Sequence, residues 1–138
     1  MLVAIKEGAK KGLKVTWDLT KILVPVYFIV TFLKHTPVIL WIADFLSPVI
    51  EFVGLSGEGG IVLILGIFIN IYASMAAIVA LGIGRREVII ITGVLMFCHS
   101  LIIEGAIAKR TGASLTVVTI VRIVMGVVSG FTLNMILP

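Results

Sequence analysis

Residues 54–84 read GLSGEGGIVLILGIFINIYASMAAIVALGIG, and two polar features of this stretch interrupt apolar runs. The first feature is a cluster of four glycines and one acid, Glu58, at residues 54–60. Glycine tolerates positive φ and costs backbone entropy in a helix, so the cluster predicts a helix break. The second feature is Asn70 and Ser74, whose four-residue spacing places both on one helix face. The combination favours a membrane transport site. The alternative is a surface turn, with the polar pair serving helix packing.

The composition is that of an integral membrane protein. Of its 138 residues, 60% are hydrophobic and 13% are charged, whereas soluble domains are about 45–50% apolar and about 25% charged. The apolar runs lack the alternation of membrane strands, so we expect an all-α protein with about four transmembrane helices. The net charge of +4 comes from basic residues that flank apolar segments, which indicates membrane anchoring and no nucleic-acid partner. We expect a multi-pass protein of the cell membrane.

The first twenty residues predict an amphipathic helix on the membrane surface. Apolar residues recur at spacings of three and four, and Trp17 would mark the interface. Four lysines accompany them, namely Lys6, Lys10, Lys11 and Lys14, and Lys21 follows directly. A solvated lead-in without membrane contact is the alternative. Residues 21–138 predict one transmembrane domain. The first span is expected over residues 17–33, which overlap the end of the amphipathic segment and contain Pro25.

The segment before the glycine cluster predicts a second helix break. Ser47 and Pro48 have the pattern of an N-cap followed by proline at the first helical position. A break there would leave a short descending arm, so the cluster would form the tip of a re-entrant hairpin at membrane depth, followed by a span over residues 61–83. The alternative is one interfacial helix, an exposed loop and then that full span.

Ionisable residues interrupt the next apolar run, residues 88–108. His99 and Glu104 are five residues apart, roughly 140° round a regular helix, so they converge only if the helix is distorted. Together they could bind a proton, an ion or a polar solute. Alternatively, Glu104 pairs with Lys109 or Arg110 in the membrane interface.

The last helix, residues 114–137, carries one basic residue and two glycines of interest. Arg122 lies inside an apolar run and needs an anionic partner. The acids that could serve are Glu104, Glu58 and Glu51. Gly126 and Gly130 are four residues apart and permit close approach to another helix, within the chain or between chains.

Three motifs together resemble the gate, or nucleoside-recognition, family of membrane proteins. They are GLSGEG at residues 54–59, GIFINIYAS at 66–74 and HSLIIE at 99–104. The family includes spore maturation membrane proteins and resembles parts of concentrative nucleoside transporters and of bacterial ferrous-iron transporters. The resemblance covers residues 21–138 and implies a gate-like domain. It also implies that Asn70 and Ser74 bind substrate and that Glu58 is the hairpin acid.

The resemblance implies half of an inverted-repeat transporter for a nucleoside-like or other small polar solute. The partner would be a second copy or a sister protein of inverted orientation. Transport could be coupled to protons or sodium. The expected site contains Glu58, Asn70, Ser74, His99 and Glu104. The alternatives are a membrane assembly subunit of a sporulation-like process and a metal-ion transporter. The sequence carries no catalytic or phosphate-binding signature, so we expect neither an enzyme nor a bound cofactor or resident metal.

Overall fold

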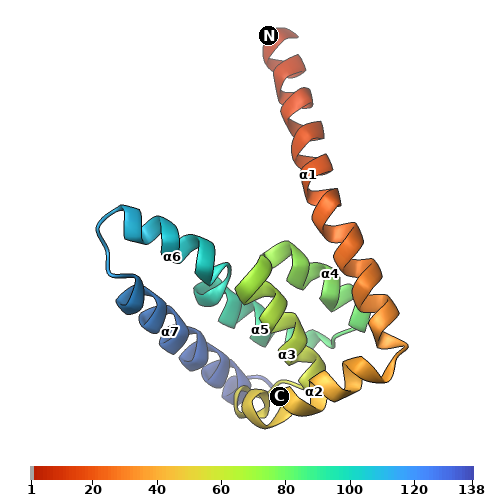
Figure 1. Ribbon diagram of the computed structural model, residues 1–138, viewed down its shortest axis with the longest axis vertical. Coiled ribbons are helices and arrows are strands. Elements are labelled where there is room, and N and C mark those ends of the chain that lie inside the picture. Colours follow the sequence, from red (N-terminus) through yellow and green to blue (C-terminus); the bar gives the residue numbers. More distant parts are fainter. Residues whose placement is uncertain (1) are drawn as a thin grey trace.

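The computed structural model describes residues 2–138 and consists of helices and turns, with no strand among these residues. Figure 1 shows α1, α2 and α7 around a centre that contains α3, α4 and α5. The elements, in order, are α1 (Leu2–Lys34), α2 (Pro37–Ile50), the 3-10 turn η1 (Glu51–Val53), α3 (Gly57–Ile64), the π-helical turn η2 (Leu65–Ile69), α4 (Ile71–Leu81), α5 (Arg85–Cys98), α6 (Leu101–Arg110) and α7 (Leu115–Ile136).

The expected all-α membrane fold is confirmed. Within the described residues, three helical stretches are long and apolar enough to cross a membrane: Val3–Leu33, Arg85–Lys109 and Leu115–Ile136. A fourth span is formed if the bent pair Pro37–Val53 and Gly57–Ile69 crosses as one. The apolar side chains of the outer helices are largely exposed, as expected where lipid replaces water as the solvent.

Helix α1 is one continuous helix, which joins the expected surface helix to the expected first span. Its N-terminal half projects away from the rest of the molecule (Figure 1), and residues 3–18 are exposed. Only the C-terminal half packs against other elements, with Tyr27 and Phe28 facing Met75 and Ala76 of α4. The interfacial position of residues 1–20 stays a prediction, and Met1 lies outside the described residues.

The helix break predicted from the glycine cluster is present, and the chain turns by 89° between η1 and α3. Gly54 adopts the left-handed conformation with φ of 77°, which glycine tolerates without steric cost. The break predicted at Ser47 and Pro48 is wrong, because α2 continues through both residues. Pro48 lies only two residues before the end of α2, so the backbone hydrogen bond that it removes falls in the last turn.

The other glycines of the cluster are helical and serve close packing. Gly57 and Gly60 begin α3 and are buried against α2. A Cβ on Gly57 would overlap the backbone of Ala43, and a Cβ on Gly60 would lie 3.0 Å from Cγ1 of Ile50. The cluster therefore supplies both the turn and the contact that holds α3 against α2.

The prediction of one uninterrupted span over residues 61–83 is wrong. The helix widens into the π-helical turn η2 and then breaks at Asn70, whose backbone is extended. The Asn70 side chain begins α4 by accepting a hydrogen bond from the backbone N–H of Ala73 at 2.9 Å. Asparagine competes with helical bonding in this way because its short side chain reaches nearby backbone groups. Asn70 and Ser74 therefore do not share a face of one continuous helix.

Helices α5 and α7 pack closely through glycines. Gly126 and Gly130 are buried against α5. A Cβ on Gly130 would lie 2.8 Å from Cγ2 of Val94, and one on Gly126 would overlap Sγ of Cys98. The predicted helix-packing face is therefore used within the chain, and it brings the middle of α7 against the C-terminal end of α5.

Candidate functional site

The junction between α5 and α6 is a second irregular point in the fold. His99 is extended, and Ser100 adopts the left-handed conformation with φ of 48° and ψ of 38°. Ser100 is the one residue other than glycine with a positive φ among residues 2–138. This conformation costs an L-residue roughly 1–2 kcal/mol, so the surrounding contacts have to hold it.

One backbone hydrogen bond connects this junction to the break before α4. The N–H of Ser100 donates to the carbonyl oxygen of Gly66 in η2 at 3.1 Å. Gly66 lies in the π-helical turn that immediately precedes the Asn70 break. The two interrupted helices therefore meet, and each interruption leaves backbone groups available for other partners.

The break between α5 and α6 brings His99 and Glu104 into contact. Nε2 of His99 lies 2.9 Å from Oε1 of Glu104. The sequence required a helix distortion for these residues to converge, and the break at Ser100 supplies it. The other ring nitrogen of His99, Nδ1, lies 2.8 Å from the carbonyl oxygen of Leu95.

Arg122 of α7 completes the contact, as expected for a cation inside an apolar helix. Its Nη2 lies 2.7 Å from Oε2 of Glu104. The same guanidinium donates to two backbone carbonyls of the broken helix, from Nε to Phe97 at 2.5 Å and from Nη2 to His99 at 3.1 Å. A helix end leaves its last carbonyls free and carries partial negative charge, so a cation is favourable there.

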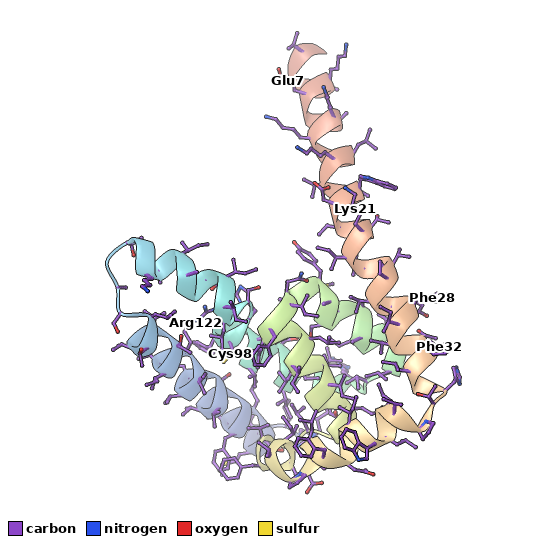
Figure 2. All side chains as sticks on the ribbon, viewed as in Figure 1. Glu7, Lys21, Phe28, Phe32, Cys98 and Arg122 are labelled. Atoms are coloured by element: carbon purple, nitrogen blue, oxygen red, sulfur yellow. The ribbon has the colours of Figure 1, made fainter. Side chains whose placement is uncertain are left out.

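We call His99, Glu104 and Arg122 the charged cluster. The Glu104 carboxylate is shared, with one oxygen toward the histidine and the other toward the arginine. The side chains of His99 and Glu104 are 34% and 40% exposed, whereas Arg122 is 18% exposed. Figure 2 shows Arg122 between α7 and the α5–α6 junction, near Cys98. The cluster therefore has a buried cationic side and an accessible acidic side.

Asn70 and Ser74, the two polar residues predicted to bind substrate, lie at the break before α4 and just after it. Asn70 forms the break itself, and Ser74 follows in the first turns of α4. Ser74 is 1% exposed, and its Oγ has no hydrogen-bond partner. A Cβ on Gly66 would lie 3.2 Å from Cβ of Ser74, so Ser74 packs against the residue that binds Ser100.

Glu58 does not join this group. It lies in the first turn of α3, whose N-cap, Ser56, donates from Oγ to Oε2 of Glu87 at 2.9 Å. Glu87 belongs to the first turn of α5, whereas His99 follows the last residue of the same helix. A helix of this length spans about 20 Å. Glu58 was predicted to share a site with His99 and Glu104, but it lies at the opposite end of α5 from both.

A polar network at the start of α5 was not predicted from the sequence, where basic residues that flank apolar segments were assigned to membrane anchoring. Arg86 donates from Nη1 to the carbonyl of Gly54 at 3.1 Å and from Nη2 to Oδ1 of Asn134 at 2.5 Å. Together with the contact between Ser56 and Glu87, this network fixes the glycine turn level with the charged beginning of a span. A turn beside charged residues at the start of a span favours the exposed loop near the membrane surface over the re-entrant hairpin at membrane depth.

Among residues 2–138, no three histidine, cysteine, aspartate or glutamate side chains are close enough together to hold a metal ion. The side chains of the charged cluster can form hydrogen bonds and ion pairs, and His99 and Glu104 can bind protons.

The chain is similar to one curated protein, the uncharacterized membrane protein YvoD of Bacillus subtilis (strain 168). The two are 42% identical over 129 residues, which make up 94% of this chain and 41% of YvoD. The chain thus spans less than half the length of that relative. No family model and no solved structure matches the chain. The relative and the three apolar spans agree that this is a membrane protein.

Proposed function

We propose that this chain is a transport unit of the cell membrane, in which the charged cluster forms part of the path of a small polar solute. The observation that carries the proposal is the meeting of two interrupted helices at the charged cluster, through the bond from Ser100 to Gly66 and the contacts of Arg122. Discontinuous helices that meet in this way form the binding sites of many secondary transporters.

The cost of the charged cluster supports a functional role. Ionisable side chains within a membrane cost at least about 2.5–3.5 kcal/mol each at the centre of a helix on insertion scales. An apolar substitution would avoid that cost, yet this chain keeps three such groups within two of its apolar spans. Residues of this kind commonly mark ion or solute pathways.

We further propose that a second unit of inverted orientation completes the pathway. Three or four spans are few to enclose a solute path, and inverted repeats solve this problem in many transporters. The partner would be a second copy of the chain or a sister protein. YvoD is more than twice as long as the region that it shares with this chain, so a further unit of similar size would fit within that relative. The nucleoside-like solute rests on the resemblance to the gate family.

An uptake assay in proteoliposomes tests this function. Purified protein would be reconstituted and supplied with radiolabelled uridine, adenosine and adenine, with an inward proton or sodium gradient. We expect accumulation above that of empty liposomes, and loss of accumulation in Glu104→Gln, whose amide keeps the shape of the side chain without its charge. Glu7→Gln is the control, because Glu7 is an exposed acid of the projecting half of α1. Folded wild-type protein that accumulates none of these solutes under either gradient would contradict the proposal.

A further inference from the structure

The hydrogen bonds of His99 determine where its protons lie. Nδ1 is 2.8 Å from the carbonyl oxygen of Leu95, and a carbonyl can only accept a hydrogen bond. Nδ1 therefore carries a hydrogen. In a neutral imidazole the second nitrogen, Nε2, is then an acceptor with an exposed lone pair.

The contact on the other side of the ring needs one more proton. Nε2 lies 2.9 Å from Oε1 of Glu104, and an ionised carboxylate can only accept. Two acceptors at this distance repel, so one proton has to lie between them. Either His99 is an imidazolium beside a carboxylate, or a neutral ring accepts from a carboxylic acid. Both forms contain the same number of protons.

We infer that His99 and Glu104 form a binding site for one exchangeable proton, held between Nε2 and Oε1, and that its release opens the contact between the end of α5 and α6. When the proton leaves for water, a neutral ring and a carboxylate remain. The ring then keeps its hydrogen bond to Leu95 or its contact with Glu104, since one ring proton cannot serve both acceptors. As the coupling site of a transporter this inference rests on the proposed function, whereas proton binding itself does not.

The surroundings hold the carboxylate in place while the proton comes and goes. Arg122 of α7 binds the other oxygen, Oε2, at 2.7 Å, so Glu104 stays anchored and the histidine ring is the part that moves. Cys98 precedes His99 on α5, and η2 and α4 carry Tyr72 as their one titratable side chain.

The rest of the described chain does not enclose the pair. His99 and Glu104 are 34% and 40% exposed, although their partner Arg122 is 18% exposed. His99 is also the residue that joins α5 to the left-handed Ser100, and Ser100 contacts η2 through Gly66. A movement of the ring would therefore act on the point where the two broken helices meet. Proton release is in this way linked to the helix breaks.

Nuclear magnetic resonance and infrared spectroscopy of the protein in lipid nanodiscs test this site. His35→Gln leaves His99 as the one histidine of the chain, so ¹⁵N-histidine labelling reports this ring alone. The pH would be varied from about 5 to 9, which includes the range where imidazoles ordinarily change charge. We expect a hydrogen on Nδ1 at low pH and a titrating proton between the residues, seen as an N–H signal at Nε2 or as a protonated-carboxyl infrared band.

Glu104→Gln provides the matched variant, because its amide N–H donates to Nε2 as a protonated carboxyl would. We expect the pH-dependent N–H signal and the carboxyl band to be lost, with a neutral ring protonated on Nδ1 throughout. A wild-type ring that is neutral with its hydrogen on Nε2 at every pH, or a titration unchanged in Glu104→Gln, would overturn the inference. If the titration is present but no solute is transported, the proton site stands and the proposed function fails.

Discussion

Arg122 connects three helices through one planar group. Its guanidinium binds Glu104 of α6 and the carbonyls of Phe97 and His99 at the end of α5, while its own backbone belongs to α7. The forked geometry of arginine suits several acceptors at once, and a lysine ammonium cannot reproduce it. The side chain therefore acts as a cap for a broken helix as well as a counter-ion.

Replacement of Arg122 by alanine should destabilise the fold. Breaking a buried ion pair costs about 3–5 kcal/mol, and the partial exposure of Glu104 places the expected loss below that range. Arg122→Lys should lie between wild type and alanine, because it keeps the charge but not the fork. Thermal unfolding in detergent measures this order. Equal stability of the lysine and arginine proteins would show that the backbone contacts contribute nothing.

Gly126 is a position where one added methyl group should destabilise the fold. In α7, Gly126→Ala places a methyl group against Sγ of Cys98, and such overpacking typically costs about 1–3 kcal/mol. Gly12→Ala in α1 is the matched control, since nothing lies near that helical glycine and alanine should add about 0.5–1 kcal/mol there. Cys98→Ala should rescue Gly126→Ala in a double-mutant cycle. Strictly additive effects of the two substitutions would contradict the contact.

Among the secondary-structure elements, the helix breaks and helix ends form the polar contacts that connect distant segments. Arg86, at the start of α5, connects that helix to the glycine turn and to α7. It binds the carbonyl of Gly54 at the turn and Asn134 near the end of α7. Arg86→Ala should therefore loosen the α2–α3 turn and α7 together. Loss of a hydrogen bond to a charged group costs about 1.5–3 kcal/mol.

Arg85→Ala is the control for that change, because Arg85 is an exposed neighbour of the same charge that forms none of these contacts. We expect stability to change by no more than about 0.5 kcal/mol there. Limited proteolysis at the glycine turn should become faster in Arg86→Ala alone. Identical cleavage rates in the two variants would rule out the anchoring role of Arg86.

The sequence predicted some of these interruptions and missed others for physical reasons. The glycine cluster marked its turn because the left-handed Gly54 is conformationally permissive. Asn70 was predicted to bind substrate, with helix packing as the alternative. Its capping role was missed, since an isolated amide in an apolar run serves packing as well as capping. That Arg122 has an acidic partner followed from the cost of an unpaired charge, and the structure selects Glu104 from the three candidate acids. The bond between Ser100 and Gly66, 34 residues apart, has no local signal in the sequence.

At the scale of the whole molecule, the two broken helices and α7 converge on the charged cluster, while the outer helices present apolar side chains. The glycine turn and the Arg86 network lie at the opposite end of α5. If the spans cross a membrane, the cluster is held by protein within it and is open on its acidic side. We therefore expect water to reach the charged cluster.

Chemical labelling of one cysteine in lipid tests that claim most directly. In a Cys98→Ala background, Ser100→Cys reports the helix break, and Val128→Cys reports an outward position on α7 that is 53% exposed. Val128 lies on the side of α7 opposite the buried Gly126 and Gly130. We predict that a small, charged, membrane-impermeant thiosulfonate modifies Ser100→Cys and spares Val128→Cys, while a lipid-soluble maleimide modifies both. If the charged reagent modifies Ser100→Cys no faster than Val128→Cys, water does not reach the helix break and the account is wrong.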